Sequence, residues 1–327
     1  MSNAQSVDLN LTPQLSASPP LSVPAIEADK QPLVSVIIPS YNRVSFLKQT
    51  IESVLAQSYS QVELLVIDDG SSDGSYELAQ QYEQIRLLTH PERQNRGQSA
   101  SINLGLQQAQ GDYIAILDSD DYWHSDKLMT QVGYLQQHAD VGLVYVNGWS
   151  VDANSQQLYR IYDDHHVEQS SPAHSVADEV LMNCYFLVPN NALVRASVFR
   201  QVGGFDESLR AAQDHDMAIR IAEVTRLAYI NKELFYYRRH ANSISQKQAD
   251  LRWQNGFLIL DKARRRYQYP SATIRKRRAV LHFRTAQCQV EKGQWLRAAK
   301  NAVTAAILDP VRSFKVLARL EPIRSPH

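Results

Sequence analysis

Cysteine is scarce in this sequence of 327 residues, and long apolar runs are missing. The two cysteines, Cys184 and Cys288, lie far apart and form no CxxC pair, so neither a disulfide framework nor a zinc site is expected. No run approaches the roughly 18 apolar residues that a membrane-spanning helix needs. The first residues also lack the charged and apolar segments of a signal peptide. We therefore expect a cytoplasmic protein, for which peripheral contact with the inner face of the membrane stays open.

Two nucleotide-binding patterns are also absent. Neither the GxGxxG pattern of dinucleotide-binding folds nor the GxxxxGK(S/T) pattern of P-loop proteins occurs. The formal net charge is zero, so no basic surplus indicates a nucleic-acid partner. The charges are unevenly spread, because lysine and arginine are dense from Lys262 to Arg284, whereas carboxylates gather at the ends of apolar runs nearer the amino terminus.

Residues 1–31 are rich in serine, proline, glutamine and alanine, and we expect them to form a disordered leader outside the fold. Beyond them, short β-branched runs alternate with segments in which apolar residues recur at helical spacing. Expected strands cover 33–38, 63–67, 85–88 and the run that starts at 113, and helices are expected between them. This alternation predicts an α/β fold with a mostly parallel sheet flanked by helices.

The stretch 113–123 is the most informative, because its apolar run ends in Asp118, Asp120 and Asp121. Carboxylates packed this closely repel one another, and a hard divalent cation such as Mg²⁺ or Mn²⁺ would hold them together. The alternative is that Asp121 or Ser125 only caps the helix that starts at 126. Asp69 ends an earlier strand. Since parallel strands end at one crevice, Asp69 could accept a hydrogen bond from a nucleotide base while Asp120 holds a metal.

Four segments in this order resemble the family 2 glycosyltransferases, which have the GT-A fold. They are VSVIIPSYNR at 34–43, SVLAQSY at 53–59, LVIDDGSSDG at 65–74 and ILDSDD at 116–121. The resemblance implies a nucleotide-diphospho-sugar donor and a divalent metal, Mn²⁺ or Mg²⁺. Asp120 corresponds to the main metal ligand of the family's DxD motif, and His240 in the later YRRH element to a second metal ligand or a phosphate contact. The implied donor-binding residues are Pro39, Tyr41, Arg43, Asp69, Gly97, Ser99, Asp118 and Arg239.

In the second half, GGFDE at 203–207 is followed by Gln213 and Asp214. The resemblance implies that Asp214 is the catalytic base of an inverting transfer to a hydroxyl acceptor, such as a growing polysaccharide, a cell-surface glycan or a lipid-linked glycan. A positioned carboxylate is needed, because a sugar hydroxyl is a poor nucleophile at neutral pH. Asp214 could also simply stabilise the first turn of a helix through its dipole. The chain departs from the family at Gln213, where a second acid is usual.

The expected organisation is the leader at 1–31, a GT-A domain at 32–245 and a helical region at 246–327. Within the GT-A domain, 32–125 would be the nucleotide-sugar-binding half and 126–245 the acceptor and catalytic half. In the helical region, Arg264–Arg266 and Arg275–Arg278 form a basic face that could rest on anionic lipid or face water. We favour water, because no large apolar stripe is expected beside these charges.

Three alternative functions stay open at this point. A polyprenyl-phosphate sugar transferase would share the motifs, although the GGFDE and YRRH elements favour ordinary sugar acceptors. A nucleotidyltransferase would share the arrangement of the sheet but release pyrophosphate. From a different functional class, the chain could be a donor-binding or scaffold protein that has lost catalysis. The replacement of the usual acid by Gln213 would then be the first sign of that loss.

Overall fold

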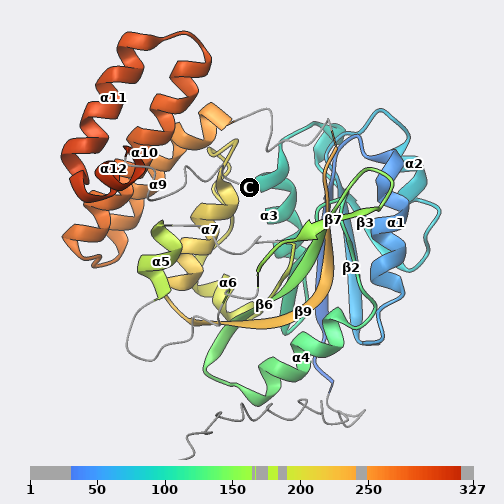
Figure 1. The fold of residues 1–327 in the computed structure, drawn as a ribbon. Helices are drawn as coiled ribbons and strands as arrows, with labels where there is room; N and C mark the ends of the chain where they lie inside the picture. Colours follow the sequence, from blue (N-terminus) through green and yellow to red (C-terminus); the bar gives the residue numbers. More distant parts are fainter. Residues whose placement is uncertain (1–30, 164–165, 167–175, 183–189, 241–248, 318–327) are drawn as a thin grey trace, which may run out of the picture.

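A mixed β-sheet with helices on both faces organises the protein (Figure 1). The structure is a computed structural model that describes residues 31–163, 166, 176–182, 190–240 and 249–317. The predicted leader therefore lies outside the described residues, except for its last position. The described strands follow the order β3-β2-β1-β4-β8-β6-β9-β5, and β7 pairs with β6.

The amino-terminal half of the sheet is parallel, as the sequence predicts. β1 (Val34–Ser40) lies between β2 (Val62–Asp68) and β4 (Tyr113–Ile116), and β2 pairs with β3 (Ile85–Thr89). The connections contain α1 (Val44–Leu55), α2 (Ser75–Ala79), the 3-10 turn η2 (Pro91–Arg93) and α3 (Gln98–Gln108). Because these strands run in one direction, the segments that follow β1, β2 and β4 meet at one edge of the sheet.

The other half of the sheet contains antiparallel pairs. β8 (Ala192–Arg195) lies antiparallel between β4 and β6 (Val141–Val151), whereas β6 and β9 (Arg226–Arg238) are parallel. The short strands β5 (Tyr122–Trp123) and β7 (Gln157–Arg160) pair antiparallel with β9 and β6. The helices of this half are α4 (Lys127–Gln137), α5 (Val176–Met182), α6 (Ala196–Val202) and α7 (Gln213–Ala222). The predicted α/β class with flanking helices is confirmed, in a sheet that is mixed.

Strand β1 shows how the core divides into two layers. Its side chains alternate between the two faces of the sheet, and all of them are buried. Val34, Val36 and Ile38 pack with α1, α2 and α4, and Ile37 packs on the opposite face with α3, α6 and α7. A strand buried on both faces fits the nearly continuous apolar run seen in the sequence.

The carboxy-terminal helices, drawn in orange and red in Figure 1, pack on this core. They are α9 (Ala249–Arg266), α10 (Ser271–Glu291), α11 (Trp295–Leu308) and α12 (Pro310–Leu317). α9 contacts α7 and α10 contacts α5, and Ile259, Leu260 and Leu281 belong to the same apolar cluster as the inner side of α7. None of the helices among the described residues combines the length and the hydropathy of a membrane span.

Part of the predicted basic face is used in contacts within the chain. Arg266 forms an ion pair with Glu223, and Arg277 is buried and donates a hydrogen bond of 2.8 Å to the carbonyl of Met182. Most of the large exposed apolar side chains in this region lie instead on α11 and α12. The exposed apolar surface therefore lies beyond the basic segments, nearer the end of the described chain.

Candidate active site

The turn after β4 gathers the three carboxylates that the sequence singles out. The N–H of Asp121 donates to the carbonyl of Asp118 at 3.1 Å, which closes a tight turn. Oxygens of Asp118, Asp120 and Asp121 lie within 4.8 Å of one another. Helix α4 has Asp126 as its N-cap residue, so the alternative in which Asp121 or Ser125 is present only to cap it is wrong. The three residues form what we call the acid turn.

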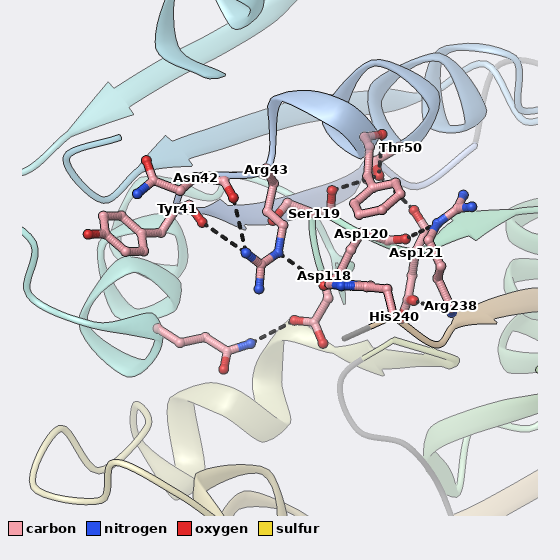
Figure 2. A network of polar contacts seen from close by, with 12 residues as sticks. Tyr41, Asn42, Arg43, Thr50, Asp118, Ser119, Asp120, Asp121, Arg238 and His240 are labelled. Carbon is pink, nitrogen blue, oxygen red and sulfur yellow. Dashed lines mark hydrogen bonds and ion pairs between the residues drawn. The ribbon is translucent and has the colours of Figure 1, made fainter. Parts of the chain in front are cut away.

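Asp120 is contacted by side chains from the segments that follow two other strands (Figure 2). Arg43, just after β1, donates from Nε to Asp120 Oδ2 at 3.1 Å. His240, two residues after β9, places Nε2 at 3.0 Å from the same oxygen, and its ring packs against Phe46. The predicted metal ligands Asp120 and His240 and the predicted donor-binding residue Arg43 therefore lie together.

Asp118 and Asp121 are bridged by Asn190, which the sequence analysis missed. The Asn190 amide nitrogen donates to Asp118 Oδ2 at 2.8 Å and to Asp121 Oδ2 at 2.9 Å. Its amide oxygen accepts the Asp118 N–H at 2.7 Å, and its own carbonyl accepts from Trp123 Nε1 at 2.9 Å. Asn190 is almost completely buried. The adjacent asparagines at 190 and 191, just before an apolar strand, were the only sequence signal.

The charges of the acid turn are unequal. Burial, reinforced by the charge of Asp120, raises the pKa of Asp118 to about 7. Burial and the charges of Asp120 and Asp118 also raise the pKa of Asp121 well above its usual range. Burial acts in the same direction on Asp120, but the hydrogen bond with His240 and the charge of Arg43 outweigh it, and the pKa of Asp120 is lowered. Asp120 is therefore the carboxylate that stays ionised most readily.

Gln213, the residue at which the chain departs from the family, connects to the acid turn. Its amide nitrogen donates to Gln98 Oε1 at 2.9 Å, and Gln98 donates to Asp118 Oδ1 at 2.7 Å. The charge of Asp214 contributes to the raised pKa of Asp118, so the predicted base is close enough to act on the acid turn. A neutral side chain at 213 adds no further negative charge to this region.

Helix α7 separates the roles of its two first-turn carboxylates. Asp216 is buried and pairs with Arg220 at 2.9 Å, and Arg220 also donates to the carbonyls of Val202 and Gly204. No ion pair among the described residues involves Asp214. Ala212, just before α7, has a φ of 61°, a left-handed conformation that is costly for a residue with a side chain. Asp216 thus anchors the loop before α7, which leaves Asp214 as the candidate base.

Asp69 fixes the loop that precedes α3. Its two carboxylate oxygens accept the N–H groups of Arg96 and Gly97 at 2.7 and 2.8 Å. Gly97 has a φ of +90°, a backbone conformation that side-chain-bearing residues rarely adopt and that glycine adopts readily. In the following turn of α3, Ser99 is buried and its hydroxyl has no hydrogen-bond partner among the described residues.

The other predicted donor-binding residues lie at different depths. Pro39 is buried in β1, whereas Tyr41 is 46% exposed beyond the end of that strand. Arg239 contacts the hydroxyl of Tyr159 on β7. Its neighbour Arg238 contacts the acid turn, because its N–H donates to Asp121 at 2.8 Å. Arg238 is the last residue of β9, and its Nε also donates to the carbonyl of Asp120 at 2.8 Å, whereas Arg239 lies beyond the end of the strand.

Comparison with solved structures defines the fold as GT-A. The TarS 1-349 structure from S. aureus, in complex with UDP-GlcNAc, has a TM-score of 0.64 and 18% identity, over 84% of this chain and 81% of that chain. The mannosyltransferase PcManGT from Pyrobaculum calidifontis, in complex with GDP-Man and Mn²⁺, has a TM-score of 0.59 and 21% identity, over 89% of this chain and 79% of that one. At these identities the likeness concerns the fold.

The family follows from the sequence comparison. The model of glycosyl transferase family 2 matches residues 35–203, slightly more than half of the chain, so the protein belongs to this family. An uncharacterized glycosyltransferase of Rickettsia prowazekii is 30% identical over 64% of this chain. The match spans 65% of that relative, just under two thirds of its length. Glycosyltransferase GlyG of Streptococcus pneumoniae is 28% identical over 68% of this chain and 75% of its own.

Proposed function

We propose that the protein is a metal-dependent, inverting glycosyltransferase that uses a nucleoside-diphosphate sugar as donor. The observation that carries the proposal is the acid turn, where three carboxylates of a family 2 chain meet beside a candidate base. Two proteins of the same fold have been solved with such donors, TarS with UDP-GlcNAc and PcManGT with GDP-Man and Mn²⁺. Donors of this chemical class suit the positions of Arg43 and Ser99.

The acid turn fits a divalent cation. Its ligand atoms are all oxygens, which Mg²⁺ and Mn²⁺ prefer, and they lie within 4.8 Å of one another. The raised pKa of Asp118 reflects charge that a cation would compensate. Asp120 would be the main ligand and His240 would be a second ligand or a phosphate contact. A bound cation would stabilise the negative charge of the nucleoside diphosphate as it leaves.

The chain's own residues would perform the rest of the reaction. The loop fixed by Asp69, together with Pro39, Tyr41, Gly97 and Ser99, would hold the nucleoside part of the donor. The positive charges of Arg43 and Arg239 would attract the phosphates of the donor.

Asp214 would remove the proton of the acceptor hydroxyl as its oxygen forms a bond to the anomeric carbon. The bond from that carbon to the diphosphate breaks in the same step, so the configuration of the sugar is inverted. A positioned base of this kind accelerates a reaction by a factor of roughly 10² to 10⁴. Since Asp216 is held by Arg220, it is not available for this role.

The acceptor class that we propose is a glycan of the cell surface, either polymeric or lipid-linked. TuaG of Bacillus subtilis, which is described as a teichuronic acid biosynthesis glycosyltransferase, is 42% identical over 33% of this chain and 44% of its own length. The shared segment is short, so it supports the class of acceptor but no particular sugar or linkage.

The decisive experiment is a screen of nucleotide sugars with Mn²⁺ or Mg²⁺, with Tm and the release of nucleoside diphosphate as readouts. We expect one nucleotide series to raise the Tm only when the metal is present. Asp120→Asn should lose the metal-dependent rise. Asp214→Asn should keep the metal-dependent rise in Tm, but its rate of sugar transfer should fall by a factor of roughly 10² or more. Asp126→Asn, at the exposed N-cap position before α4, is the matched control and should behave as the parent protein, because Asn and Asp cap helices about equally well.

Different outcomes distinguish the alternatives. Normal turnover by Asp214→Asn would show that another group is the base. Binding of a donor without any release of nucleoside diphosphate would favour a donor-binding protein without catalysis. Release of pyrophosphate would assign the chain to the nucleotidyltransferases, and transfer to a polyprenyl phosphate to the lipid-carrier enzymes.

A further inference from the structure

Helices α11 and α12 turn their large apolar side chains outward. On α11, Ala298 and Ala305 are buried against the neighbouring helices, while Leu296 and Ile307 are 91% and 74% exposed. Phe314 on α12 is 67% exposed. Trp295, Val303 and Val311 are also exposed. Leu296, Val303 and Ile307 recur at intervals of seven and four residues, so they line one side of α11. We call this surface, with its flanking cations, the α11–α12 face.

The same two helices carry cations and no carboxylate. Arg297 and Lys300 lie on α11 and Arg312 and Lys315 on α12, all exposed. Arg312 is also close enough to Arg284 for its positive charge to help lower the pKa of that guanidinium, which burial lowers first. On α9, two of the exposed cations form ion pairs within the chain, Arg264 with Asp261 and Arg266 with Glu223. Exposed positive charge therefore coincides with exposed apolar surface at α11 and α12.

We propose that the α11–α12 face docks the protein onto an anionic membrane surface. A helix with bulky apolar side chains among lysines and arginines can insert those side chains at the boundary of the headgroups, while the cations contact acidic lipids. The inference is independent of the proposed function, because it involves no donor, metal or catalytic residue. It would bring the enzyme to the surface at which a lipid-linked acceptor is found.

Charge complementarity also decides against a second copy of this chain as the occupant. A twofold dimer places the same patch of both copies face to face. Such a contact would oppose the four cations of one copy to the four of the other, without any carboxylate on either helix to pair with them. Like charges brought together in an interface disfavour association. An anionic lipid surface attracts the same cations.

The test is cosedimentation of the full chain with vesicles of phosphatidylcholine alone and of phosphatidylcholine mixed with phosphatidylglycerol. We expect binding to the anionic vesicles that weakens with salt, and little binding to the neutral ones. Replacing both Arg297 and Lys300 by Gln should weaken binding roughly thirtyfold, because each cation near such a surface contributes about a fivefold factor. Leu296→Gln with Ile307→Gln should weaken binding at any salt concentration.

Matched controls come from exposed residues elsewhere. Leu258→Gln on α9, 54% exposed, and Lys48→Gln on α1 should bind vesicles as the parent protein does. All of these positions are exposed, so the Tm of every variant should stay close to that of the parent. Failure to bind anionic vesicles, or equal binding to neutral ones, would overturn the proposal. A dimer in light scattering that Leu296→Gln with Ile307→Gln disperses would instead assign the face to a second copy.

Discussion

Asn190 is the residue on which the geometry of the acid turn depends most directly, since its amide touches both Asp118 and Asp121. We expect Asn190→Ala to lower the affinity for Mn²⁺ by about 10- to 100-fold, as the loss of a residue that orients metal ligands does. Calorimetric titration of the metal would measure this directly. The variant should also lose about 1–3 kcal/mol of stability, because buried polar atoms lose their partner.

Asn103 provides the matched control. Its side-chain amide also makes two hydrogen bonds across the fold, but to backbone groups, the N–H and the carbonyl of Phe205 at 2.6 and 2.9 Å. Asn103→Ala should cost similar stability and leave the Mn²⁺ affinity unchanged. If both variants lost metal affinity equally, the effect of Asn190→Ala would be one of general destabilisation rather than of orientation.

His215 makes the stability of the fold depend on pH. It is buried under α7, where its Nε2 lies 2.8 Å from the carbonyl of Val180. Burial first, and then the charge of Arg277, lowers its pKa from 6.5 to about 3. A histidine that is neutral when folded contributes stability in full above its unfolded pKa, and this stability is lost as the pH falls toward the folded value.

Urea unfolding at several pH values would measure the effect. Between about pH 6.5 and pH 5 the loss due to His215 should reach up to about 2 kcal/mol. His215→Gln should flatten this part of the profile, whereas His124→Gln, at a partly exposed position, should not. A parent protein with no slope in this window would show that His215 becomes charged without cost.

At the scale of elements, the local sequence pattern was enough to predict the parallel half of the sheet. The other half depends on pairing between distant segments, which the local pattern does not encode. β1, β2 and β3 were predicted within two residues at each end, because each is a short and mostly apolar run. β5 and β7 were missed, since strands of two and four residues carry no readable period. β8 is antiparallel because of its neighbours in the sheet, which no local signal encodes.

The same reason separates the predicted from the missed parts of the site. Asp118 and Asp120 end an apolar run, so the sequence alone singled them out, and the resemblance gave Asp120 its proposed role. Asn190 acts across 72 positions of sequence, and Gln213 contacts Gln98 across 115. Such contacts exist only after the sheet has formed.

Helix α3 packs so closely on the sheet that Gly105 is required. A Cβ at this position would lie 2.5 Å from Cγ2 of Ile37 and 3.1 Å from Cδ1 of Ile67. Gly105→Ala should therefore destabilise the protein by about 1–3 kcal/mol, despite the gain of about 1 kcal/mol in helix propensity. Urea unfolding would measure the change.

Gly256→Ala on α9 is the informative comparison. There the nearest atom, also at 2.5 Å, is a terminal methyl of Leu281 on a side chain that can turn away. Ile37 is β-branched and held in the central strand, so it has less freedom to move. We expect Gly256→Ala to lose much less stability than Gly105→Ala. Equal losses would mean that the sheet beneath α3 adapts as readily as the contact between α9 and α10.

At the scale of the whole molecule, the helical region that the sequence sets apart at 246 shares an apolar core with residues 126–245. Arg277 on α10 contacts both the carbonyl of Met182 and the ring of His215, and Leu281 lies in the same apolar cluster as Met217. Contacts that bury apolar side chains from both parts couple their unfolding. We therefore expect α9 and α10 to unfold together with α7, rather than as a separate domain.

Native-state hydrogen exchange would test this coupling. Amides of α10 around Leu281 should open with the same free energy as those of α7 around Met217, and Leu281→Ala should lower both by about 2–5 kcal/mol. The exposed helix α12 is the internal control, because it contributes no residue to that cluster and should exchange at lower cost. If Leu281→Ala lowered protection in α10 but left α7 unchanged, the carboxy-terminal helices would be an independent unit. The boundary at 246 would then be a true domain boundary.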